Sequence, residues 1–90
     1  MKALFQLRAV VVTQGVQHLM TDLGLDPVHL LARHVAGDWG DLSADDKKEN
    51  DYSVTRSLRI FSAYEIGDSK LWIITEADRS VTTILLPEEY

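Results

Sequence analysis

Residues 58–76, LRIFSAYEIGDSKLWIITE, contain two β-rich runs joined by a turn. Side chains in residues 58–66 alternate between two faces, as they do in a half-buried strand. One face carries Arg59, Phe61, Ala63 and Glu65, and the other carries Ile60, Ser62, Tyr64 and Ile66. Residues 67–69, GDS, are typical of a tight turn, so we expect residues 70–76 to pair antiparallel with residues 58–66.

Two further strands are predicted outside this hairpin. Residues 77–80, ADRS, turn the chain again, and residues 81–86, VTTILL, form the last strand before Pro87. Near the N-terminus, residues 8–13, RAVVVT, are a β-branched run suited to a strand that is covered on both faces.

The first predicted helix follows this N-terminal strand. Thr13 is its expected cap and Gly24 its expected stop, because these residue types favour the two ends of a helix. The apolar residues at i, i+3, i+4 and i+7, which share one face, are Val16, Leu19, Met20 and Leu23.

A second helix is predicted in residues 25–38, with Asp26 as cap, Pro27 as the first helical residue and Gly37 as the stop. The third spans residues 43–54 and is capped by Ser43. Its apolar content is low, so we expect a short, largely solvated helix in which Tyr52 and Val54 contact the core.

This order of elements predicts an α+β fold in a single domain, residues 1–90. An N-terminal strand and two to three short helices precede a three-stranded antiparallel meander. The meander is expected to form one sheet with the helices on one face. Ninety residues are too few to bury two separate cores.

Composition limits the classes of function. The chain has no cysteine, which excludes disulfides, thiolate metal sites and a cysteine nucleophile, and is typical of the cytoplasm. It shows no signal peptide and no apolar run of about 20 residues, so no membrane association is expected. A formal net charge of −5 argues against binding to double-stranded DNA. We expect no cofactor, and dimerisation remains open.

The segment HVAGDWGDL, residues 34–42, gathers an imidazole, an indole and two carboxylates. In a purely structural interpretation, this segment ends one helix at Gly37 and turns at Gly40 toward the next helix. In a functional interpretation, His34, Asp38 and Asp41 are residue types that can bind a metal ion. Their spacing matches no recognised metal-binding motif, so no metal site is expected.

A second polar concentration lies in residues 75–83, TEADRSVTT. If the fold brings residues 34–42 and 75–83 together, these two polar segments form a contact surface for another protein or RNA. The candidate binding residues are Asp38, Trp39, Asp41, Glu76, Asp78 and Arg79. The candidate catalytic residues, for a ribonuclease without metal, are His34, Glu76, Arg59 and Arg79: an acid–base pair with arginines to hold the phosphate.

The blocks RHVAGDWGDL, residues 33–42, and WIITEADRSVTTILLPEEY, residues 72–90, resemble an uncharacterised family of small bacterial proteins, as do Asn50 and RIFSAY, residues 59–64. That family is related to plasmids and mobile elements, and its members are sometimes labelled type I restriction modification subunits. The resemblance implies a mobile-element neighbourhood and no particular chemistry.

In topology the chain also resembles RelE/ParE-type toxins, with Arg59 and Tyr64 at strand positions where those toxins carry functional side chains. Three functions therefore stay open. The first is a small macromolecule-binding domain from a mobile element, which is not an enzyme. The second is a metal-independent ribonuclease of RelE/ParE-like topology. The third is an acidic mimic of nucleic acid that inhibits a defence or restriction enzyme.

Overall fold

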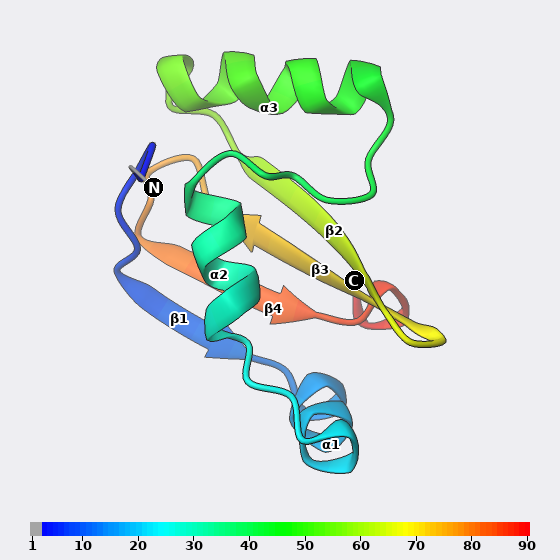
Figure 1. The fold of residues 1–90 in the computed structure, drawn as a ribbon. Coiled ribbons are helices and arrows are strands. Elements are labelled where there is room, and N and C mark those ends of the chain that lie inside the picture. Colours follow the sequence, from blue (N-terminus) through cyan, green and yellow to red (C-terminus); the bar gives the residue numbers. More distant parts are fainter. Residues whose placement is uncertain (1–2) are drawn as a thin grey trace.

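The computed structural model describes residues 3–90. Within these residues, three α-helices pack around one four-stranded sheet in an α+β fold (Figure 1). In chain order the elements are β1 (Ala9–Val12), α1 (Gln14–Leu23), α2 (Val28–Val35), α3 (Ala44–Arg56), β2 (Ile60–Ile66), β3 (Ser69–Thr75), β4 (Val81–Leu85) and the 3₁₀ helix η1 (Pro87–Glu89). None of the helices in the described part combines the length and apolar character that crossing a bilayer requires.

The sheet has the strand order β1-β4-β3-β2 and is mixed rather than antiparallel throughout. As expected, β2, β3 and β4 form an antiparallel meander, in which Thr75 pairs with Ile60 on one side and Thr82 on the other. β1 joins as a fourth strand, parallel to β4, with Val12 opposite Ile84. A three-stranded meander is therefore an incomplete description of the sheet. β3 occupies only one side of β4, so the other side is free to satisfy the backbone of β1.

One face of the sheet, which we call the inner face, packs against α1 and α2. The central cluster of buried core residues consists of Val16, Leu30, Tyr64, Leu71, Ile73 and Ile84. The predicted alternation of β2 is consistent with this arrangement, because Ile60, Ser62 and Tyr64 are all fully buried. The opposite, outer face carries Phe61 and, on β3, Trp72.

The ends of α1 and α2 follow local backbone chemistry. The Thr13 hydroxyl accepts a hydrogen bond from the Val16 amide, and Gly24 adopts a left-handed conformation at the end of α1, as expected. In α2 the capping position falls on Pro27, one residue later than predicted. The carboxylate of Asp26 nevertheless accepts a bond from the Val28 amide, at 3.0 Å, and so fulfils the capping role.

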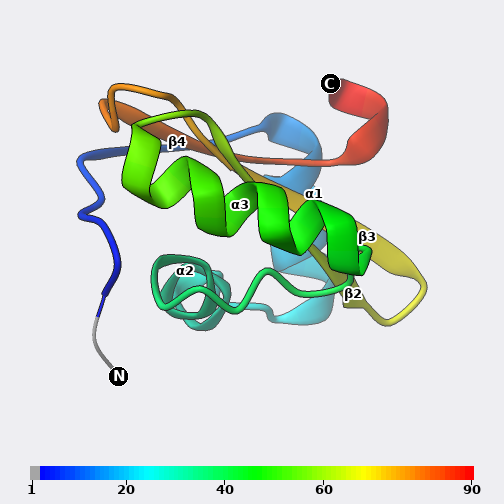
Figure 2. The same cartoon turned by 90° about the horizontal axis from the view of Figure 1, so that it is seen from above.

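α3 lies along the β2 edge of the sheet rather than beside α1 and α2 on the inner face (Figure 2). The expectation that all helices share one face is therefore wrong for α3. Its polar composition gives the reason, since its buried residues are Asn50 and Ser53. Tyr52, expected to contact the core, is 53% exposed.

Side-chain hydrogen bonds hold α3 against β2. The amide of Asn50 donates to the carbonyl of Phe61, at 2.5 Å, and its oxygen accepts the Phe61 N–H, at 3.1 Å. Asn50 therefore completes the backbone bonding of β2 as a neighbouring strand would. This pairing protects part of an edge that would otherwise expose unpaired backbone groups.

The segment before α3 closes the rest of the β2 edge. The Asp41 N–H donates to the carbonyl of Ala63, at 2.7 Å, and the Ala63 N–H donates to the carbonyl of Trp39, at 3.2 Å. Gly40, between them, forms a parallel bridge with Ala63. The carboxylate of Asp41 then accepts the Glu65 N–H, at 2.8 Å. The backbone of residues 39–41 and the carboxylate of Asp41 thus serve the sheet edge.

The edge-closing role of Gly40 can be tested by comparing alanine substitutions at Gly40 and Gly67. Both glycines have a positive φ, 77° and 58°. A Cβ at Gly40 would lie 2.0 Å from the carbonyl oxygen of Ala63, whereas a Cβ at Gly67 meets nothing within 4 Å. Gly67→Ala should cost about 1 kcal/mol of unfolding free energy, from backbone strain alone. Gly40→Ala should cost more than about 3 kcal/mol, because the loop must leave the edge. Urea unfolding measures both, and equal losses would contradict the edge-closing role of Gly40.

Candidate functional site

His34, near the end of α2, is completely buried and bound through both ring nitrogens. Nδ1 lies 2.6 Å from the Ser62 hydroxyl of β2, and Nε2 lies 2.8 Å from the Thr75 hydroxyl of β3. The Thr75 hydroxyl in turn lies 2.8 Å from that of Thr82 in β4. A hydrogen-bonded chain therefore runs from α2 across three strands.

Aromatic rings surround the same imidazole. The rings of Phe5 and Trp39 meet it edge-on, with centroids 5.3 and 5.9 Å away. Trp39 is only 3% exposed, and its indole N–H donates to the carboxylate of Asp51 in α3, at 3.0 Å. Neither the imidazole nor the indole of HVAGDWGDL is presented to solvent.

Burial, together with the smaller effect of the positive charge of Arg79, lowers the pKa of His34 to about 4. The folded protein therefore holds this imidazole in its neutral form at pH 7. A general acid–base must also reach the proton that it transfers. Both nitrogens of His34 already bond to hydroxyls inside the core, so its geometry is that of a structural histidine.

Arg79 binds the protein's own backbone at the turn after β3. Its guanidinium donates to the carbonyl oxygens of Ser53, Leu58, Glu76 and Ala77, at 2.6 to 3.2 Å. Burial lowers the pKa of Arg79. Because these bonds occupy both terminal nitrogens of the guanidinium, Arg79 joins the end of α3 to the β3–β4 turn.

Arg59 and Glu76 form a separate, half-exposed pair. Their charged atoms lie 3.4 Å apart, and Arg59 also donates to the hydroxyl of Tyr90, at 3.1 Å. The hydrogen bond to Tyr90 and the charge of Glu76 raise the pKa of Arg59. The four candidate catalytic residues thus divide into a buried imidazole, a backbone-bound arginine and an exposed ion pair.

The remaining candidate binding residues are tied to their own turns. Asp38 forms an ion pair with Arg33, at 2.6 Å, which lowers the pKa of its carboxyl group. Asp78 accepts hydrogen bonds from the amide and hydroxyl of Ser80. Among residues 3–90, no group of three or more histidines and carboxylates could hold a metal ion.

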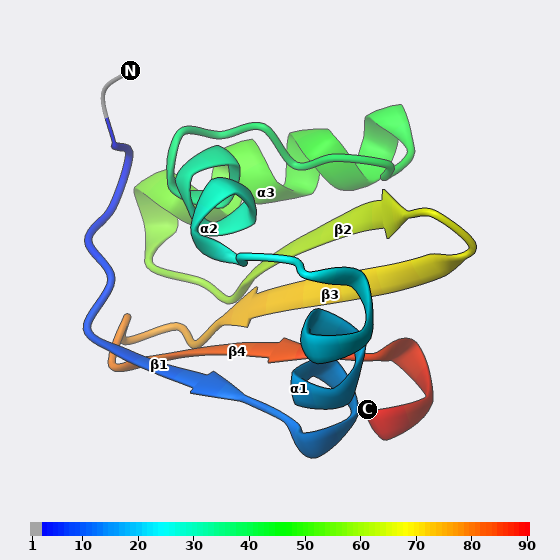
Figure 3. The same ribbon diagram turned by 60° about the horizontal axis from the view of Figure 1, so that its bottom comes forward.

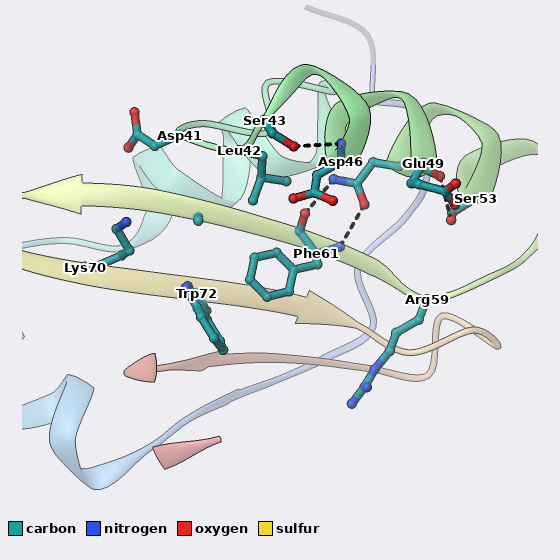
Figure 4. A pocket seen from close by; sticks show the side chains of 12 residues that line it. Asp41, Leu42, Ser43, Asp46, Glu49, Ser53, Arg59, Phe61, Lys70 and Trp72 are labelled. Carbon is teal, nitrogen blue, oxygen red and sulfur yellow. Dashed lines mark hydrogen bonds between the residues drawn. The ribbon is translucent and has the colours of Figure 1, made fainter. Parts of the chain in front are cut away.

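A groove of about 600 Å³ lies between α3 and the outer face of the sheet (Figure 4). The rings of Phe61 and Trp72 form its floor, with centroids 4.8 Å apart and planes inclined at 57°. Both rings are half-buried, and the Tyr90 ring lies 5.7 Å from that of Trp72. We call this feature the α3 groove.

Carboxylates outnumber cations along the α3 groove. The acidic residues that line it are Asp41, Asp46 and Glu49, and the basic residues are Arg59 and Lys70. Arg59 is already neutralised by Glu76, which lies outside the lining. Within residues 3–90, no cation lies within ion-pair distance of Asp46 or Glu49. The α3 wall therefore presents two carboxylates beside an aromatic floor.

The alternation in residues 58–66 places Phe61 and Arg59 on one face of β2 but does not single out the α3 groove. Trp72 joins Phe61 only through the register of β2 with β3, in which Trp72 lies opposite Ala63. Aromatic residues on two consecutive strands are the one signal of this floor that the sequence contains. The position of α3 has no such local signal.

Comparison of the chain with protein-family models, with curated proteins and with solved structures finds no match to any of them.

The buried imidazole predicts an acid-sensitive fold. Since the folded pKa of His34 is about 4 and the ordinary value is 6.5, protons bind the unfolded chain first as the pH falls. Stability is complete above about pH 6.5 and is lost toward about pH 4, at up to 1.4 kcal/mol per pH unit. Between pH 7.5 and 5.0, the wild type should therefore lose about 2 kcal/mol of unfolding free energy.

Urea unfolding at the two pH values measures this loss. His34→Gln keeps hydrogen-bonding capacity but cannot titrate, so its pH-dependent loss should be smaller by about 2 kcal/mol. His18→Gln, at an exposed position of α1, should behave as the wild type does. An identical loss in His34→Gln and wild type would show that His34 is not the titrating group.

Proposed function

We propose that this protein is a binding module, not an enzyme, and that the α3 groove is its contact surface. The proposal rests on one observation: the adjacent Phe61 and Trp72 rings form the floor of a groove beside the carboxylates of α3. Aromatic residues that remain partly exposed are enriched in protein interfaces, where they bury a large area at little entropic cost.

The chemistry of the groove favours a basic side chain of a protein partner. A lysine or arginine over the face of Trp72 would gain a cation–π interaction. Its charge would lie beside Asp46 and Glu49, for which the described residues offer no cation within ion-pair distance. Lys70, at the β3 side of the groove, would suit an acidic neighbour in the same partner segment.

An RNA partner is less well matched to this surface. Aromatic rings can stack on bases, but single-stranded sites combine such rings with a positively charged groove. The α3 groove has more carboxylates than cations, and the whole chain carries −5. A ribonuclease based on His34 would need an imidazole that RNA can reach, and His34 has no exposed surface.

A titration with a short peptide of alternating glycine and arginine tests the proposal. The two indole N–H resonances provide the readout by NMR. The Trp72 signal should shift as the peptide fills the groove, whereas the Trp39 signal should stay, because that indole is buried and bonded to Asp51. A peptide with glutamate in place of arginine is the control for charge.

Asp46→Asn and Asp45→Asn form a matched pair. Each removes one negative charge from the first turn of α3, but only Asp46 lines the groove. Asp46→Asn should weaken peptide binding about threefold more than Asp45→Asn, as expected for loss of one solvent-exposed ion pair. Equal weakening, or a shift of both indole signals, would mean that the peptide binds only through the overall charge.

A further inference from the structure

The two edges of the sheet differ in how they are protected. The β2 edge is closed by Asn50 and by residues 39–41. At the other edge, β1 is exposed along most of its length, with Val10 40% and Val11 48% exposed. The expectation of a strand covered on both faces is therefore wrong for β1, because it lies at the edge of the sheet. Figure 3 shows β1 as the outermost strand, beside β4. A free edge of this kind is a template for pairing with another strand.

The backbone of β1 directs two residues outward. The Ala9 N–H donates to the Ser80 carbonyl, at 3.3 Å, and the Thr13 N–H donates to the Ile84 carbonyl, at 3.1 Å. In a parallel ladder, alternate residues bond to the same neighbour. The peptide groups of Val10 and Val12 therefore point away from β4, on either side of Val11.

The edge also lacks the features that usually prevent pairing. Natural edge strands carry lysine, proline or a bulge that blocks a second strand. The sequence of β1 is AVVV, without a charge or a proline, and its four residues pair with β4 in unbroken register.

We propose that β1 pairs antiparallel with β1 of a second copy of this chain, across a two-fold axis at Val11. In this register, Val10 exchanges two backbone hydrogen bonds with Val12 of the partner subunit, and Val12 exchanges two with Val10 of the partner subunit. The two Val11 side chains meet at the axis on the outer face, as a close non-hydrogen-bonded pair. The two sheets become one continuous sheet.

A second copy of this chain matches the β1 edge in hydrogen bonding and in charge. The outward groups are symmetric about Val11, so one patch satisfies itself under a two-fold operation, as an isologous interface requires. Charge is also compatible, because Arg8 is the only charged residue in residues 8–14. The proposed register places Arg8 opposite Gln14 of the partner subunit, so no like charges face each other.

Sedimentation velocity over a range of concentrations tests the proposal. The wild type should shift from the monomer mass of 10.1 kDa to twice that mass as concentration rises. Val11→Lys should remain monomeric, because it places two ammonium groups together at the axis. Val28→Lys, at an exposed valine on α2, should dimerise as the wild type does. Circular dichroism establishes that both variants are folded.

Amide hydrogen exchange gives a second readout that needs no variant. The Val10 and Val12 amides should exchange slowly at high concentration and quickly at low concentration. The Val11 amide, which points toward β4, should be protected at both. A wild type that stays monomeric at millimolar concentration, or a Val11→Lys variant that dimerises as the wild type does, would overturn the proposal.

Discussion

The buried imidazole of His34 is the constraint on which much of this fold depends. Burying a polar ring costs free energy unless its nitrogens are hydrogen-bonded, and here Ser62 and Thr75 occupy both. The hydroxyls can donate or accept, so the chain through Thr75 to Thr82 is satisfied in either tautomer. Because the partners lie on separate strands, α2 can take only one position and rotation on the sheet.

The position of α2 determines the path of residues 36–44. Gly37 turns the backbone through a left-handed conformation, and the Tyr64 hydroxyl then binds the carbonyl of Asp38, at 2.7 Å. These contacts bring Gly40 onto the β2 edge and start α3 alongside it. The polar residues of HVAGDWGDL are thus architectural, and their arrangement leaves the aromatic outer face open beside α3. The same arrangement protects one sheet edge and leaves β1 unprotected.

Local signals in the sequence were sufficient for the helices and strands, because caps, turns and alternation act over a few residues. Thr13 and Ser43 cap their helices as predicted. The parallel pairing of β1 with β4 could not be predicted in this way, since it joins residues about 70 positions apart.

The candidate site was harder to predict from the sequence than the fold. Ser62 is a polar residue on an otherwise apolar strand face, but only the register of β2 with β3 brings it beside Thr75, where both bind His34. The α3 groove likewise depends on Asn50, a single residue that seats a polar helix against β2.

An NMR titration of the His34 ring, labelled with ¹³C and ¹⁵N, tests this account most directly. The ring signals should remain those of a neutral imidazole down to about pH 5, with half-protonation at a pKa of about 4. Such a result would establish a buried, structural histidine at the junction of α2, β2 and β3. Half-protonation near the ordinary value of 6.5 would mean that solvent reaches the ring and would contradict the account.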